Sequence, residues 1–306
     1  MQTLATTTSR RAPDLSVVIA SVNGLGVLEP TLDALDALPE RQRTEVIVVE
    51  TLGSETRLAL ASRVHEVVIV ESERMPIPRL RYQGVRQARG AIVAILEDHA
   101  RVAPDWAKSL LAMHDEPRWG AVGGPVENGE KGLINWAVYF CEYAPYMAPV
   151  AEGESSDLPG NNIAYKRPHL LRHASLLDEG KWESWINARI RADGVPIGST
   201  NAMVVNHIKP FRFGYFLTQR YHFARSYAGM RRVDQSWFKR LIYGLGSIAL
   251  PALLTARVAK TVFAKKRHLG RFLIVSPVVA LFLTVGAFGE MVGYLIGPGS
   301  SLEHVE

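Results

Sequence analysis

The sequence is poor in cysteine, with a single such residue, Cys141, among its 306 residues. One thiol excludes an internal disulfide framework and is typical of a protein from a reducing compartment. The first residues also lack the apolar core of a signal peptide, so we expect 1–13 to be a disordered tail. No internal repeat or low-complexity linker interrupts the chain, whose length suffices for one large domain or two small ones.

Acidic residues are scarce in the last third of the chain. From His207 onward there are 14 Lys and Arg but only 4 Asp and Glu, whereas the residues before it include 21 basic and 26 acidic ones. This basic region contains two apolar runs, 241–256 and 272–297, and the second is long enough to span a bilayer. Because the basic charges flank apolar runs, they favour anionic membrane lipids as a partner and argue against nucleic acid.

The C-terminal region divides into two expected parts. Residues 207–240 mix aromatic and arginine side chains, which is typical of an amphipathic interfacial segment, and 241–306 form a hydrophobic membrane-associated region. Both flanks of the stretch at 241–258 are basic, and positive residues stay on the cytoplasmic side of a membrane. We therefore expect a re-entrant or interfacial helix there and one transmembrane span at 272–296; the alternative is two ordinary spans.

The region before His207 alternates strands with helices. Buried parallel strands are predicted by continuous β-branched runs at 15–20, 45–50, 66–71 and 91–96. Helices are predicted near 27–38, 78–89 and 180–194. This alternation predicts an open α/β sheet with right-handed crossovers, and we expect one continuous domain over 14–206.

Polar residues follow the predicted strands. The strand at 91–96 runs directly into Glu97, Asp98 and His99. The first two strands are followed by Ser21, Asn23 and Glu50. Ligands of open α/β sheets bind at the carboxyl ends of the strands, so we expect these side chains to converge on one crevice. Adjacent carboxylates resist burial unless they face water or a positive charge lies among them.

Two classes of ligand fit such a crevice. Gly24 and Gly26 after the first strand, with Glu50 after the second, resemble the dinucleotide site of an NAD(P)-dependent oxidoreductase. The third glycine position is Glu29, however, which would place a carboxylate near the pyrophosphate. The alternative is a nucleoside-diphosphate-sugar with Mg²⁺ or Mn²⁺, which binds carboxylates together with phosphates and stabilises a leaving diphosphate. A cation at 97–99 would explain why these charges tolerate each other.

Five blocks in order along the chain resemble the inverting family 2 glycosyltransferases of the GT-A fold. They read LSVVIASVNG, EVIVVE, RLRYQGVRQARGAIVAILEDHARVAPDW, LPGNNIAYKR and EGKWESWINARIRADG. The resemblance covers Leu15–Asn206 and implies a Rossmann-like, mostly parallel α/β domain, followed here by C-terminal membrane helices.

The resemblance assigns donor-binding roles to four residues near the first strands. Ala20 and Val22 lie in the turn that packs on the nucleobase in the family, although the family's aromatic residue is missing here. Glu50 matches the acid that holds the base or ribose. Arg81 corresponds to the arginine of an Ala-Arg-Asn-x-Gly block.

The family's Asp-x-Asp-like metal motif appears in this chain as Glu97-Asp98-His99. The resemblance makes Asp98 the expected metal ligand and Glu97 a donor-binding residue. His99 replaces the last carboxylate, and imidazole suits softer cations, so we expect Mn²⁺ to be favoured over Mg²⁺.

The resemblance also assigns the sugar pocket and the catalytic base. Asn161 and Asn162 belong to a block that lines the sugar pocket in the family. Inversion requires a base that removes the proton of the acceptor hydroxyl, and Glu183 at the start of a helix is the expected one. Asp178 and Glu179 are the alternatives.

The predicted function is metal-dependent transfer of a sugar, with inversion, from a nucleoside-diphosphate-sugar to a lipid-linked or other membrane-borne acceptor, as in cell-envelope polysaccharide synthesis. Residues 216–232 lack the Gln-x-x-Arg-Trp block of processive relatives, so we expect single transfers. The expected location is the cytoplasmic (inner) membrane, with the catalytic domain facing the cytoplasm. The alternatives are an NAD(P)-dependent oxidoreductase and a non-catalytic, membrane-anchored scaffold that retains the fold.

Overall fold

The computed structural model describes residues 12–306, so nearly all of the expected tail at 1–13 lies outside the described residues. The strands of the main sheet are β1 Leu15–Ser21, β2 Thr44–Glu50, β3 Val68–Glu71, β4 Ile92–Glu97, β6 Ala121–Gly123, β8 Gly153–Glu154, β9 Asn162–Lys166 and β10 Ile197–Ser199. A smaller sheet is formed by β5 Ala100–Val102, β7 Val126–Asn128 and β11 Val205–His207.

The main sheet has the order β3-β2-β1-β4-β9-β6-β10-β8, and the smaller one has the order β5-β11-β7. Strands β3, β2, β1 and β4 are parallel, whereas β9 is antiparallel to both β4 and β6. Every residue of β1 and β2 is buried, as expected for strands covered on both faces. The predicted α/β class and its four parallel strands are thus confirmed.

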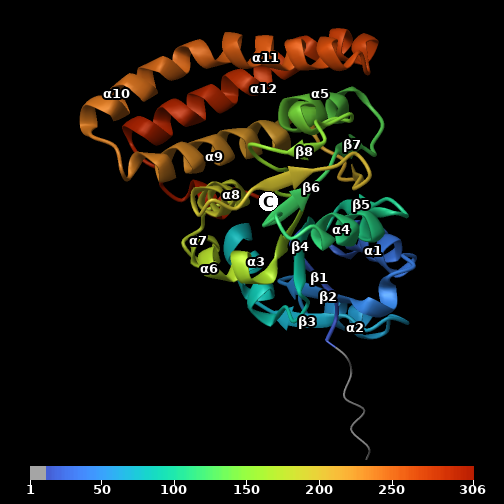
Figure 1. Ribbon diagram of the computed structural model, residues 1–306. Coiled ribbons are helices and arrows are strands. Elements are labelled where there is room, and N and C mark those ends of the chain that lie inside the picture. Colours follow the sequence, from blue (N-terminus) through green and yellow to red (C-terminus); the bar gives the residue numbers. More distant parts are fainter. Residues whose placement is uncertain (1–11) are drawn as a thin grey trace, which may run out of the picture.

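Helices cover both faces of the main sheet (Figure 1). They are α1 Leu25–Asp36, α2 Ser54–Ala61, α3 Ile77–Gln87, α4 Trp106–Asp115, α5 Leu133–Tyr143, α6 Arg167–His173, α7 Ser175–Asp178 and α8 Glu183–Ala192. The predicted helices correspond to α1, α3 and α8, with bounds that differ by three residues or fewer. α3 ends at Gln87, and Gly90, three residues later, lies against the backbone of β1, where a Cβ would be 2.6 Å from the Ser16 nitrogen.

Four further helices form a layer on one side of the sheet domain: α9 Phe213–Arg232, α10 Trp237–Gly246, α11 Leu250–Lys265 and α12 Leu269–Leu295. Figure 1 shows α9 nearest the sheet domain, α12 beyond it, and α10 and α11 outermost. By length and composition, Trp237–Lys265 and Leu269–Leu295 are both long and apolar enough to cross a membrane.

Gly84 of α3 packs so closely on the sheet that it leaves no space for a side chain. A Cβ there would lie 2.4 Å from Val18 Cγ1 and 3.1 Å from Val49 Cγ2. We expect Gly84→Ala to lower the free energy of unfolding by about 1–3 kcal/mol, because overpacking displaces the neighbouring side chains. Urea unfolding measures the change.

Gly26→Ala is the matched control, because Gly26 lies in the first turn of α1 and a Cβ added there would meet no neighbouring atom within 4 Å. The control should be neutral or stabilising by up to about 1 kcal/mol, since alanine suits a helix better than glycine. Equal destabilisation by the two substitutions would show that close packing is not what excludes alanine at Gly84.

Candidate active site

A cavity of about 350 Å³ lies at the carboxyl ends of β1 and β4. Its other walls come from α3, α5, α8 and α9. Of the residues predicted to form the site, those that line this cavity are Ala20, Val22, Arg81, Glu97, Asp98, His99, Asn161 and Glu183. The fold therefore brings together parts of the chain that are more than 160 positions apart, from Ala20 to Glu183.

Glu50 and Asn162 do not line the cavity. The Glu50 carboxylate is fully buried and accepts hydrogen bonds from the backbone N–H groups of Leu52 and Gly53, the latter at 2.6 Å. Asn162 is also fully buried; its amide accepts from Trp106 Nε1 at 2.9 Å and donates to the backbone carbonyl of Met203 at 2.7 Å. In this structure both side chains hold neighbouring segments of the chain by hydrogen bonds outside the cavity lining.

His99 lies between the two carboxylates that precede it. Its Nδ1 is 2.7 Å from Asp98 Oδ1, and its Nε2 is 3.1 Å from Glu97 Oε2. Burial alone would lower the pKa of His99, but these two carboxylates raise it to about 9. The protonated imidazole in turn lowers the pKa of Glu97 well below its usual range, against the opposing effect of burial. The two carboxylates therefore favour a protonated His99 between them.

The Asp98 carboxylate is fully engaged within the protein. Its Oδ2 accepts from the backbone N–H groups of Val22 and Asn23, each at 2.9 Å. Its Oδ1 accepts from Asn23 Nδ2 at 2.9 Å and from His99 Nδ1. A carboxylate offers about four lone-pair positions, and these contacts occupy all of them. Asp98 thus holds the β1 turn and orients His99.

His207, at the end of β11, completes a cluster that the sequence alone did not predict. Single ligand atoms of Glu97, His99 and His207 all lie within 4.8 Å of one another. Burial and the nearby charge of His99 lower the pKa of His207 to about 3, so its imidazole is neutral and has a free lone pair. β11 pairs with β5, which begins directly after His99, and this pairing places the two imidazoles 4.6 Å apart.

A buried arginine connects this cluster to Glu183. Arg81 Nη1 lies 2.8 Å from Glu183 Oε1, and Arg81 Nη2 lies 3.9 Å from Glu97 Oε1. Arg81 and Glu183 are each only 2% exposed. Asn161 donates to Glu97 Oε2 at 3.1 Å, while its buried Oδ1 has no hydrogen-bond partner. A buried acceptor without a donor at the cavity wall is suited to contact a bound ligand.

The alternative acids, Asp178 and Glu179, are exposed and do not line the cavity. Glu179 pairs instead with Lys181, at 2.8 Å. A further acid, Glu142 of α5, does line the cavity, and burial raises the pKa of its carboxyl. On the α9 side the cavity wall is largely aromatic and includes Phe216, Phe223 and Tyr227.

The fold is that of the GT-A glycosyltransferases. Residues 16–171, just over half of the chain, match the family model described as "Glycosyl transferase family 2". The chain belongs to this family, and the predicted membership is confirmed. No curated protein sequence matches the chain.

Solved structures with a similar fold include two glycosyltransferases. The mannosyltransferase PcManGT from Pyrobaculum calidifontis, solved with GDP-Man and Mn²⁺, is 20% identical, with a TM-score of 0.55 over 94% of this chain and 86% of that one. GalNAc-T7, solved with UDP, GalNAc and Mn²⁺, is 16% identical, with a TM-score of 0.52 over 66% of this chain. That match spans 45% of the GalNAc-T7 chain. At these identities the similarity establishes the GT-A fold.

Proposed function

We propose that the protein transfers a sugar from a nucleoside-diphosphate-sugar to a lipid-linked or other membrane-borne acceptor, with inversion and in single transfers. The reaction depends on Mn²⁺ or Mg²⁺ and takes place at the cytoplasmic face of the inner membrane, with 14–206 as the catalytic domain. One observation carries the proposal: Arg81 lies close to both Glu97 and Glu183 within one cavity. It thereby connects the cluster of Glu97, His99 and His207 to the buried carboxylate of Glu183.

The donor set fits a divalent cation. Glu97, His99 and His207 supply one carboxylate and two imidazoles within a small volume, and this mixed set favours Mn²⁺. Asp98, hydrogen-bonded to His99 Nδ1, would leave His99 Nε2 as the ligand atom and fix the ring orientation, as carboxylates do behind the histidine ligands of many metal sites. When bound, the cation would neutralise the diphosphate and stabilise it as a leaving group. We therefore assign the ligand role to Glu97, His99 and His207 in place of Asp98.

Glu183 is the proposed general base. The acceptor oxygen forms a bond to the anomeric carbon while the bond to the diphosphate breaks on the opposite face, and Glu183 takes the hydroxyl proton. Arg81 holds the carboxylate in place by the 2.8 Å ion pair. A Cβ at Gly160 would lie 2.8 Å from Glu183 Oε2, so the glycine leaves space for this carboxylate to reach the cavity.

The family membership and the structural neighbours support the choice of donor. Both neighbours were solved with Mn²⁺ and with a guanine or uracil nucleotide, and GDP-Man is itself a nucleoside-diphosphate-sugar. The family assignment also favours this ligand class over the nicotinamide dinucleotide. For the acceptor, the support is the position of the cavity beside the apolar α12: Phe216 of α9 lines the cavity and also contacts Phe282 of α12.

Donor turnover tests the proposal directly. We expect the purified protein to release the nucleoside diphosphate from one member of a panel of nucleoside-diphosphate-sugars, slowly and to water when no acceptor is added. Release should stop with EDTA and resume when Mn²⁺ is restored. Thermal stabilisation by NAD(P) alone, without metal, would support the oxidoreductase. Failure of every donor to bind or turn over would support the non-catalytic scaffold.

A further inference from the structure

The N-terminal end of α12 is attached to the sheet domain through the turn that joins it to α11. Lys265 Nζ donates to the backbone carbonyl of Pro145 at 2.9 Å. Arg267 Nη1 donates to Glu127 Oε1 at 2.6 Å and to the carbonyl of Ala148 at 3.0 Å. Glu127 belongs to β7, and the other two acceptors follow α5. This end of α12 therefore lies on the same side of any membrane as the catalytic cavity.

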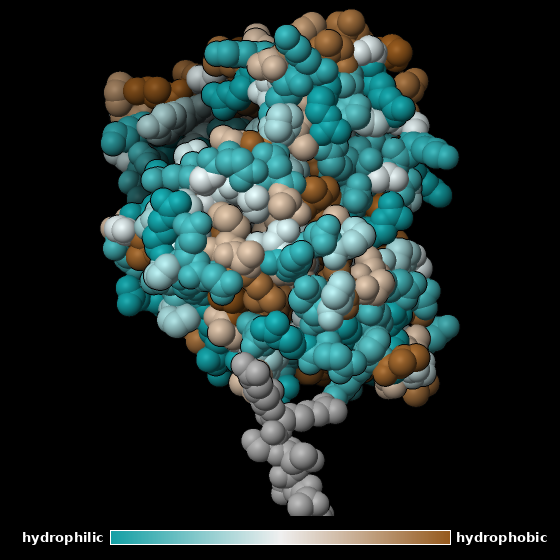
Figure 2. All heavy atoms as spheres, turned by 45° about the vertical axis from the view of Figure 1, so that its right-hand side comes forward, coloured by the Kyte–Doolittle hydropathy of each residue, from teal (hydrophilic) through white to brown (hydrophobic). Residues whose placement is uncertain are grey.

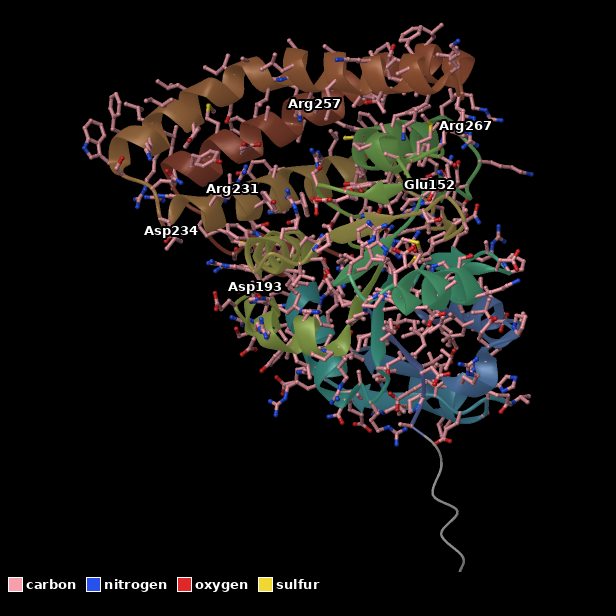
Figure 3. The ribbon with its side chains drawn as sticks, viewed as in Figure 1. Glu152, Asp193, Arg231, Asp234, Arg257 and Arg267 are labelled. Carbon is pink, nitrogen blue, oxygen red and sulfur yellow. The ribbon has the colours of Figure 1, made fainter. Side chains whose placement is uncertain are left out.

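The C-terminal end of α12 is attached to α9 and, through the residues that follow it, to the sheet domain. Arg225 of α9 donates from Nε to the carbonyl of Gly297, just after α12, at 3.1 Å. The chain then folds back, and the Glu306 carboxylate accepts from Tyr215 Oη at 3.0 Å and pairs with Arg74 of the sheet domain. Figure 3 labels Arg231, in the last turn of α9, and Arg267 at opposite ends of the helical layer.

Between its two ends, α12 packs directly against α9. A Cβ at Gly289 would lie 2.5 Å from the carbonyl oxygen of Tyr221, and one at Gly293 would lie 2.4 Å from that of Arg225. α9 also carries Arg220, which lines the catalytic cavity, and Arg231. A helix this rich in arginine would be costly to place in the hydrocarbon core beside α12.

These attachments are incompatible with a helix that crosses a bilayer. A spanning helix separates its ends by the thickness of the hydrocarbon core, about 30 Å, and leaves them on opposite sides. We propose that α10, α11 and α12 form a monotopic platform: all three lie in the plane of one leaflet, and none of them spans the membrane. This proposal extends the expected in-plane position of 241–258 to α12 and replaces the single span expected at 272–296.

The outer surface of this platform has the composition of a lipid-binding surface. Its exposed apolar side chains include Trp237, Phe238, Ile242, Ile248, Leu253, Phe263, Leu273 and Ile274. Figure 2 shows hydrophobic atoms gathered along the top of the molecule, above a mostly hydrophilic body. Exposed basic residues on the same helices and their connecting turn are Lys239, Arg257, Lys260, Lys266 and Arg271. Apolar area with basic charge matches the interface of an anionic leaflet.

Cysteine labelling of vesicle-bound protein tests this topology. Single cysteines are placed at exposed positions before α10, at the start of α12 and after α12, as Asp234→Cys, Gly270→Cys and Ser300→Cys. Lys108→Cys on α4 is the control for the outside of the vesicle. Cys141 can remain, because it is buried and burial raises the pKa of its thiol to about 12, so the wild type reports the background. The protein is added to preformed vesicles containing phosphatidylglycerol, and floated vesicles are treated with a membrane-impermeant maleimide.

We expect all four introduced thiols to react to the same extent, before and after the vesicles are permeabilised. Protection of Gly270→Cys alone would show two spans, and protection of Ser300→Cys alone would show one span formed by α12; either result would overturn the proposal. Failure of the wild type to float with the vesicles would overturn the proposal as well. That result would indicate that the exposed apolar surface of α10, α11 and α12 binds a second copy of the chain. No outcome depends on enzymatic activity, so the result is independent of the proposed function.

Discussion

Glu183→Gln should lower kcat by about 10²–10⁴-fold, the usual contribution of a general base. The amide keeps the size of the side chain but cannot accept the acceptor proton. Because Glu183 lies beside Arg81 and not among the proposed metal ligands, the Kd of the donor with Mn²⁺ should change little. Turnover of the active donor, measured together with donor affinity by calorimetry, separates these two effects.

Glu179→Gln is the matched control for this prediction. Glu179 is an exposed acid outside the cavity and pairs with Lys181. The kcat of the Glu179→Gln protein should therefore stay within about twofold of the wild-type value, because the side chain does not touch the reacting atoms. The melting temperature of Glu183→Gln must also be measured, because the change leaves the buried Arg81 without its charged partner. A folded Glu183→Gln protein with normal kcat would exclude Glu183 as the base. Glu142, a further acid that lines the cavity, would then be the next candidate for the base.

His207→Ala should weaken Mn²⁺ binding by at least about 10–100-fold, since loss of a ligand lowers metal affinity no less than loss of a group that only orients a ligand. Donor turnover at low Mn²⁺ should fall in parallel and recover partly at high Mn²⁺. The reason is geometric: His207 supplies one of the three converging ligand atoms, and its neutral imidazole needs no deprotonation. Titration of Mn²⁺ into the protein, followed by calorimetry, measures the affinity.

His114→Gln provides the comparison for the histidine prediction. His114 is another buried imidazole, and burial lowers the pKa of its ring to about 4, but its Nε2 contacts the carbonyl of Ala164 away from the cavity. Its loss should leave Mn²⁺ affinity unchanged. Unaltered affinity in His207→Ala, combined with complete loss in Asp98→Asn, would return the ligand role to Asp98.

The fold class and the family could be predicted from the sequence. Continuous β-branched runs at 15–20 and 45–50 predicted strands of a parallel sheet buried on both faces, and β1 and β2 are fully buried. The position of 97–99 at the carboxyl end of a strand likewise placed the candidate site at the edge of the sheet. These are local patterns, and local patterns can be recognised without knowledge of distant contacts.

Which side chains face the cavity depends on contacts between distant parts of the chain, so it could not be predicted from the sequence. Three consecutive residues point in different directions, so Asp98 turns toward the backbone of the β1 turn while Glu97 and His99 meet His207. His207 is more than 100 positions away along the chain, and its role depends on the pairing of β11 with β5. The position of α12 also depends on long-range contacts. Its length and hydropathy suit a membrane span. The contacts that attach its two ends to Glu127 and Arg225 cannot be recognised from a hydropathy pattern.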